Sequence, residues 1–310
     1  MRFLLLLPLL TTLSAEEQQW PTRTQSPKPI LEQLPEKNGA AIWSTTHFII
    51  ACEIEISHSR LNDFAQTMES VPWLFKQLPL PLWVPPQRTK PVVRLCRDET
   101  SFVARGAPVA AAGCYHPHSG EILIRGDLLL NPPQANATRL QPAPNEDLLI
   151  HELIHLAMHQ YGGRLPTWLV EGLPEYFAAC HIRKGRYDFT RGVLLIRQHI
   201  EKFYPFNTPP ILTIPSPTTL ANTSSRQWLK NINLNAVEES YRQYASSLLL
   251  THYYLEGGSQ RRKELQNYLT QTLASDPHQL APPLLKNPKA VGNQLKSFWK
   301  QKGLALKFTN

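Results

Sequence analysis

Several features that define common functional classes are missing from this sequence. No two cysteines are spaced as CxxC, so a thiolate metal site is not expected. No apolar run approaches the roughly 20 residues that a membrane-spanning helix needs. Lysine and arginine outnumber aspartate and glutamate by 32 to 24, but they are dispersed and no aromatic and basic motif accompanies them. Nucleic-acid binding is therefore not predicted, and the positive charge suits an anionic surface or acidic substrates.

The N-terminal sequence MRFLLLLPLLTTLSA has the composition of a secretory signal. One basic residue precedes a short apolar core, and the small residues Ser14 and Ala15 follow it. We therefore expect residues 1–15 to be removed and the mature protein to be secreted or periplasmic, with no membrane span. Residues 16–42 are polar and contain prolines, which predicts a weakly ordered leader.

Four cysteines remain in a chain that is expected to be exported. An oxidising compartment favours disulfides, and four cysteines allow three connectivities. Cys96 and Cys114 are close in sequence and are expected on adjacent strands, which favours a disulfide between them. Cys52 and Cys180 would then form the second pair.

The motif HELIH places His151 and His155 four residues apart. On an α-helix the two imidazoles differ by about 40° in direction and about 6 Å in rise, so they can converge on one ion. A catalytic zinc site uses three protein ligands and keeps a fourth position for water. Glu152 follows the first histidine and is the candidate general base. With 11 histidines in 310 residues, the HExxH pattern is expected by chance about 0.02 times.

The flanking residues predict a helix of about four turns for this motif. Asn145 or Asp147 can cap its N-terminus, and Gly162-Gly163 ends it. Five apolar residues supply a face that can be buried: Leu148, Leu149, Leu153, Ile154 and Leu156.

Histidine is not predicted to supply the third ligand. His159 lies about 12 Å along the helix from His151, too far for one ion, and is interpreted as a surface residue or as one that contacts a ligand. The metzincin pattern also fails, because Met158 takes its glycine position and no methionine follows to form a Met-turn.

An acidic ligand on the next helix remains. That helix is expected to begin at Pro166 or Thr167, and Glu171 lies on it. Glu171 is therefore the predicted third ligand. Glu175 is one turn further along the same face, where it would accept a hydrogen bond from a liganding histidine and fix its tautomer.

HELIH followed by LPTWLVEGLPEYFA resembles the gluzincin zinc peptidases, specifically the secreted peptidase MA-like proteins with an LPxWLxEGLAEYF-type helix. The resemblance implies one Zn²⁺ per chain, with its ligands, base and supporting carboxylate at His151, His155, Glu171, Glu152 and Glu175. Pro174 stands where that pattern usually has alanine. A proline inside a helix removes a hydrogen bond at a cost of about 3 kcal/mol, so we expect the helix to kink or to restart after Gly172.

The order of predicted elements indicates an α+β fold with two lobes. Residues 43–180 form a zincin-like lobe, with a mixed sheet over the active-site helix, and residues 181–310 form a mainly helical lobe. In the first lobe we expect strands at 47–56 and 92–96, a hairpin at 113–126, and helices at 61–78 and 99–104. In the second we expect helices at 189–203, 236–256, 264–273 and 288–302 and a proline-rich loop at 204–225.

The resemblance extends to two further elements. The strand 119–126 would line the cleft and pair with an extended peptide substrate. The segment YASSLLLTHYYL is similar to a helix of the MA-like proteins, and in the related aminopeptidases a tyrosine opening that helix hydrogen-bonds the oxyanion. This implies Tyr244 as a catalytic residue. A core aromatic residue is the other interpretation of Tyr244, and Tyr241 is the substitute candidate.

These features together predict a secreted zinc metallopeptidase that acts on peptides or proteins. Zinc would activate a water, Glu152 would take its proton, and Tyr244 would stabilise the oxyanion. The alternative is a non-catalytic, metal-stabilised binding protein that is secreted or held at the cell surface. The intact Glu152 argues against that alternative, because a structural site has no use for a base.

Overall fold

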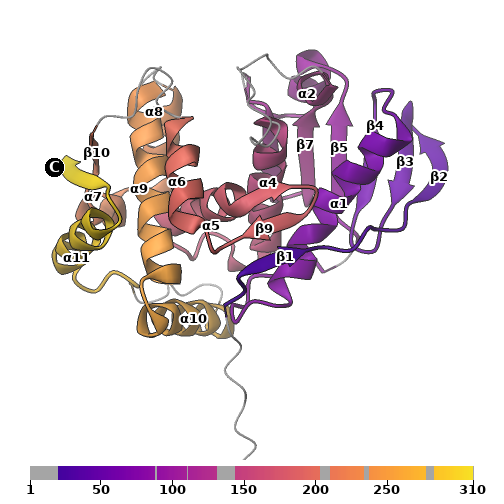
Figure 1. The fold of residues 1–310 in the computed structure, drawn as a ribbon. Coiled ribbons are helices and arrows are strands. Elements are labelled where there is room, and N and C mark those ends of the chain that lie inside the picture. Colours follow the sequence, from indigo (N-terminus) through magenta and orange to yellow (C-terminus); the bar gives the residue numbers. More distant parts are fainter. Residues whose placement is uncertain are drawn as a thin grey trace, which may run out of the picture.

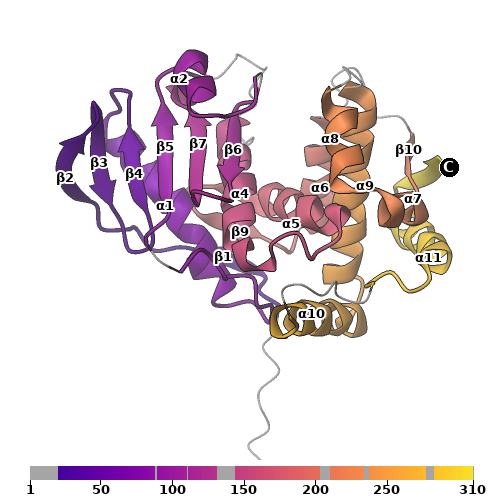
Figure 2. The ribbon, with the colours of Figure 1, turned by 180° about the vertical axis from the view of Figure 1, so that it is seen from behind.

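The chain folds as an α+β protein, with a mixed six-stranded sheet in its N-terminal half and a mainly helical C-terminal part (Figures 1 and 2). The main apolar core is one cluster of buried side chains, with members from Phe48 to Leu304 in the sequence. The predicted lobes 43–180 and 181–310 therefore share a single core. The predicted signal lies outside the described residues. Within the described residues, no helix combines the length and apolar character needed to cross a membrane. The computed structural model describes residues 20–87, 89–109, 111–130, 144–202, 210–233, 237–276 and 283–309.

The sheet is parallel at its centre and antiparallel at its margins. Its strands lie in the order β2 (Glu32–Lys37), β3 (Ala40–Ser44), β4 (Ile49–Cys52), β5 (Val92–Cys96), β7 (Glu121–Arg125) and β6 (Gly113–His116). β4, β5 and β7 run parallel, and the remaining neighbours pair antiparallel. Asn38 and Gly39, with φ of 53° and 73°, turn the chain from β2 into β3, as a two-residue hairpin loop requires.

The two faces of the sheet carry different helices. Side chains alternate along a strand, so Val93 and Leu95 of β5 join the core beneath α1 (His58–Phe75) and α4 (Pro144–Ala157). Cys96 of β5 and Leu123 of β7 point to the opposite face and pack with Phe102 of α2 (Glu99–Ala104). The sheet therefore covers the helix that carries HELIH, as predicted.

The second helix of the motif occupies the middle of the molecule. α5 (Thr167–Cys180) packs between α4 and α9 (Val237–Glu256). The other helices are α3 (Gly126–Leu130), η1 (His159–Tyr161), α6 (Gly192–Glu201), α7 (Pro217–Asn222), α8 (Ser225–Asn233), α10 (Ser259–Ala274) and α11 (Pro288–Gln301). Two small sheets complete the fold, one of β1 (Arg23–Gln25), β9 (Arg186–Asp188) and β8 (His181–Arg183), the other of β10 (Ile211–Pro215) and β11 (Ala305–Thr309).

Pro174 does not interrupt α5. The helix runs unbroken from Thr167 to Cys180 with Pro174 inside it, so the predicted restart after Gly172 is wrong. Gly172 lies so close to α9 that a Cβ atom there would be 2.6 Å from the backbone oxygen of Ser247. Burial of α5 on both sides stabilises the helical path and outweighs the hydrogen bond that the proline removes.

Two segments that were expected to be irregular are ordered. The predicted leader, 16–42, contains β1, β2 and the start of β3. β2 is polar and almost fully exposed, so its sequence lacks the alternation of apolar residues that predicts a strand. It is a strand because it pairs with β3. The predicted loop 204–225 contains β10 and α7, and β10 is a strand because it pairs in parallel with β11, some ninety residues later.

The predicted disulfide between Cys96 and Cys114 is wrong. β7 lies between β5 and β6, so the two cysteines are not on adjacent strands. Two strand spacings amount to about 9.6 Å, beyond the roughly 7 Å that a disulfide spans between Cα atoms. Cys52 and Cys180 are not bonded either, and all four thiols are free.

We predict that these thiols are unreactive in the folded protein and fully reactive in the unfolded chain. Burial raises the pKa of Cys52 and Cys96 to about 11 and that of Cys114 to about 12, so little thiolate forms at pH 8. Alkylation without reductant, followed by mass measurement, should label four thiols per chain in guanidinium chloride. Recovery of fewer labelled thiols in the denatured, unreduced sample would show a disulfide.

Candidate metal centre

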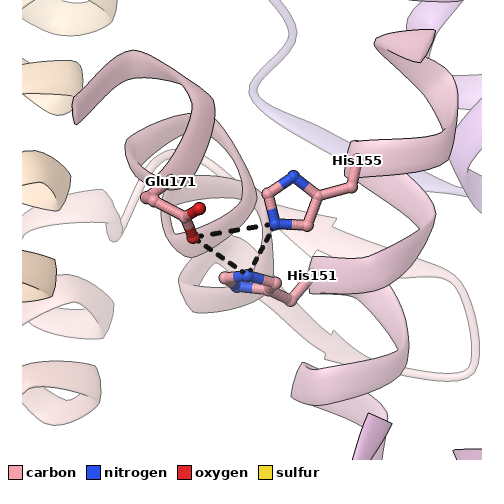
Figure 3. Close-up of side chains that lie close together, drawn as sticks. All are labelled: His151, His155 and Glu171. Atoms are coloured by element: carbon pink, nitrogen blue, oxygen red, sulfur yellow. Dashed lines mark hydrogen bonds and ion pairs between the residues drawn. The ribbon is translucent and has the colours of Figure 1, made fainter. Parts of the chain in front are cut away.

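The two histidines of HELIH point in the same direction from α4. Their Nε2 atoms are 3.0 Å apart, and the imidazole ring of each is largely buried (Figure 3). The helix that carries them ends at Ala157, earlier than predicted, and Gly162 and Gly163, with positive φ values of 44° and 70°, instead follow η1. The i, i+4 spacing therefore produces a pair of nitrogen donors that face one point.

Glu171 approaches this point from α5. Its Oε2 lies 3.5 Å from Nε2 of His151 and 3.7 Å from Nε2 of His155. Ligand atoms about 2.1 Å from a tetrahedral zinc ion are about 3.4 Å from one another. The three observed separations, 3.0, 3.5 and 3.7 Å, lie on both sides of that value. Two imidazole nitrogens and one carboxylate oxygen therefore form a donor set that fits zinc and leaves a fourth position.

The electrostatics of the cluster favour a cation. Burial would raise the pKa of Glu171, but the imidazoles of His155 and His151 outweigh it and hold that pKa at about 2. Burial would lower the pKa of His151, yet the carboxylates of Glu171 and Glu175 raise it well above its ordinary value. Carboxylates that remain ionised in a buried position create the negative potential that a metal ion requires.

Glu175 holds His151 from behind. Its Oε1 lies 3.1 Å from Nδ1 of His151, on the side of the ring away from the other two ligands. A carboxylate can only accept, so Nδ1 carries a proton and Nε2 is the nitrogen that would bind a metal. The structure thus brings Glu175 to the place predicted for it.

A buried chain of ionisable side chains continues behind Glu175, and the sequence did not indicate it. Oε2 of Glu175 lies 2.6 Å from Nε2 of His199 on α6. Nδ1 of His199 lies 3.9 Å from Oδ2 of Asp147, which is paired with the ammonium group of Lys202. Asp147 had been a candidate helix cap, but it lies inside α4. No motif spacing connects these residues, because they come from helices that meet only in the folded chain.

Glu152 and Tyr244 lie beside the ligands. Glu152 is 7% exposed, and no hydrogen bond or ion pair joins it to another of the described side chains. The ring of Tyr244 on α9 is 6.4 Å from that of His151, and burial together with the charges of Glu171, Glu175 and Glu152 raises its pKa. Its other side packs edge-on against Trp228 of α8, at 5.3 Å between ring centroids.

Tyr244 is therefore the tyrosine that the fold brings to the cluster. Tyr241 lies on the same helix about one turn earlier, and it is not among the rings that contact His151 or His155. The ring of Tyr244 thus lies beside that of His151, and its catalytic role stays a prediction.

His159 and the predicted substrate strand have other places in the fold. Nδ1 of His159 lies 2.6 Å from the hydroxyl of Tyr115 on β6, and His159 does not join the ligand cluster. The segment 119–126 corresponds to β7, which lies between β5 and β6 and is not an edge strand. Within the part of the chain that the structure describes, β2 and β6 are the edge strands of this sheet, and Gly113 of β6 packs against Leu148 of α4.

The first turn of α4 is tied to the β8–β9 hairpin through Glu146. Its Oε2 accepts the backbone N–H of Lys184 at 3.3 Å, and Nδ1 of the buried His181 lies 3.9 Å away. Burial, reinforced by the negative charges of Asp147 and Asp63, raises the pKa of Glu146 to about 7.

We predict that Glu146→Gln changes how stability depends on pH. Between pH 4.5 and 7 the folded protein keeps a proton on Glu146 that the unfolded chain has lost, so the free energy of unfolding falls as pH rises. Glutamine does not titrate and lacks this decrease. Urea unfolding at pH 4.5, 6, 7 and 8 should therefore show the variant gaining at most about 3 kcal/mol relative to the native protein. Parallel curves for the two proteins would contradict the raised pKa.

No protein-family model matches this sequence, and no curated protein matches it. The site is therefore assigned from its own geometry, and the likeness to gluzincins stays a prediction.

Proposed function

We propose that this protein is a zinc-dependent metallopeptidase that is secreted or periplasmic. The observation that supports this proposal is the arrangement of His151, His155 and Glu171, whose three donor atoms lie at the mutual distances that a tetrahedral zinc site needs. Glu152 and Tyr244, the two groups needed for acid–base and oxyanion chemistry, lie beside those ligands. Bound zinc would lower the pKa of a water and polarise the scissile carbonyl.

Glu152 is suited to the role of proton carrier. It adjoins a ligand on α4, yet its carboxylate is not one of the three donors and is not paired with another described side chain. It can therefore take a proton from the attacking water and pass it to the leaving amine nitrogen. Its burial keeps bulk water away from that transfer.

Tyr244 is suited to stabilising the charge that develops on the carbonyl oxygen. Its phenol stays protonated, because burial and the neighbouring carboxylates raise its pKa. A protonated phenol is a hydrogen-bond donor, and its bond to an oxyanion is stronger than its bond to a neutral carbonyl. The edge contact with Trp228 limits how far the ring can turn.

The edge of the sheet next to α4 would give the substrate a place to bind. β6 is the edge of the sheet next to α4, and an extended peptide would add to it through backbone hydrogen bonds. Such pairing tolerates many side chains, which suits a peptide or protein substrate.

We predict that purified protein holds about one zinc ion per chain, and that Glu152→Gln keeps this zinc but loses turnover at least about 100-fold. The expectation follows because Glu152 is a base and not a ligand. Metal analysis and cleavage of a peptide library measure the two properties on the same sample.

His155→Ala is the matched control, since it removes a ligand from the same helix and should lose the zinc itself. Full activity in Glu152→Gln would rule out the role of base. Unchanged zinc in His155→Ala would place the metal elsewhere. Wild-type protein that binds zinc and cleaves no peptide would favour the non-catalytic alternative.

We predict that Tyr244→Phe lowers turnover about 10- to 1000-fold with a much smaller change in KM, because the hydroxyl acts mainly in the transition state. The ring remains, so zinc content and thermal stability should stay near those of the native protein. Tyr241→Phe is the matched control and should keep full activity. A less stable Tyr244→Phe protein with native turnover would show that the hydroxyl only supports the core.

A further inference from the structure

We propose that His199 is a positioning residue for the metal centre, holding Glu175 so that Glu175 keeps His151 oriented toward the zinc. The inference rests on the proposed zinc site and adds to it a group that touches neither metal nor substrate. Asp147, which pairs with Lys202, faces His199 from its other side.

A chain of contacts runs from the ligand toward the surface through His151, Glu175, His199, Asp147 and Lys202. Glu175 uses one oxygen for Nδ1 of His151, at 3.1 Å, and the other for Nε2 of His199, at 2.6 Å. Both carboxylate oxygens are thus committed, and the carboxylate plane is fixed by two imidazoles from different helices. A carboxylate held at one oxygen only could rotate about its last bond, and the hydrogen bond to His151 would weaken.

These side chains are buried, so each polar group depends on its neighbours for hydrogen bonds. Glu175 is 8% exposed, His199 6% and Asp147 8%. His151 and His199 are the two groups that contact the carboxylate oxygens of Glu175. A buried carboxylate that lost one of these donors would be left partly unsatisfied. His199 therefore helps Glu175 to remain an acceptor for His151.

The ring of His199 lies between two carboxylates. Its Nε2 donates to Glu175, because a carboxylate cannot donate. Its Nδ1 faces Oδ2 of Asp147 at 3.9 Å, and Lys202, three residues further along α6, pairs with the same carboxylate. Asp147 belongs to α4, so the chain of contacts that begins at His151 returns to the same helix.

Two substitutions separate the hydrogen bond from the bulk of the ring. His199→Gln keeps a donor near the position of Nε2, whereas His199→Asn keeps one only near Nδ1. We expect His199→Asn to weaken zinc binding about 10- to 100-fold and His199→Gln to stay within about 3-fold of the native protein. Zinc affinity is measured at constant pH by competition with a chelator of known affinity, on protein shown to be folded by circular dichroism.

His181 offers a matched control. It is 1% exposed, lies at the end of α5 and faces Glu146 of α4, much as His199 faces Asp147, but it does not contact Glu175. His181→Asn and His181→Gln should leave zinc affinity unchanged. If His199→Asn does not fold, Asp147→Asn replaces it, with an expected loss of about 3- to 10-fold.

The outcomes separate the two proposals. Native affinity in His199→Asn, or equal losses in His199→Asn and His199→Gln, would overturn the positioning role while the zinc site stands. An equal loss in the His181 variants would also overturn it, since any buried histidine would then have the same effect. Zinc that survives His155→Ala would instead overturn the zinc site itself, and no peptide cleavage is needed to reach that result.

Discussion

The packing of α4 against α5 determines the distances among the three candidate ligands. Two ligands come from one helix and the third from the other, so their distances depend on how those helices pack and not on any loop. α9 covers the far side of α5 and carries Tyr244 to the same place. Three packed helices are a rigid support, and a site built on them varies less than one built on connecting segments.

The buried charges of this region are costly to the fold unless opposite charges or hydrogen bonds balance them. Replacing a buried ion pair with apolar side chains of similar volume is often neutral or stabilising, so such groups rarely persist for the fold alone. Here four carboxylates, Asp147, Glu152, Glu171 and Glu175, lie near three histidines. Lys202 pairs with Asp147, histidines contact Glu171 and Glu175, and the proposed metal ion would add further positive charge.

The sequence predicts the local parts of this fold well and the non-local parts poorly. β5 and α2 have the predicted bounds, and α1, α9 and α11 begin or end within a few residues of them, because apolar periodicity and caps are local signals. The order of strands is not local. The hairpin sequence does not show that β7 lies between β5 and β6. For this reason the predictions of the disulfide and of 119–126 as an edge strand were both wrong.

The candidate site divides in the same way. His151, Glu152 and His155 are set by spacing on one helix, and Glu171 and Glu175 by a second spacing plus the resemblance. His199 and Trp228 have no such signal, because each acquires its role only by meeting a residue from a distant part of the chain. β1 has the same origin, since its partner β9 lies more than 160 residues later. Pairings of this kind come from the whole fold, where tertiary context overrides local propensity.

The candidate site depends on a glycine at position 172, where a larger residue would not fit. It follows Glu171 directly and has no chemical role, yet the backbone of Ser247 leaves no room for one methyl group beside it. An alanine there would move α5 away from α9 and carry Glu171 with it, whereas metal–ligand distances are held to about 0.2 Å. The freedom of the chain to change in sequence is therefore restricted at a residue that is not one of the candidate ligands.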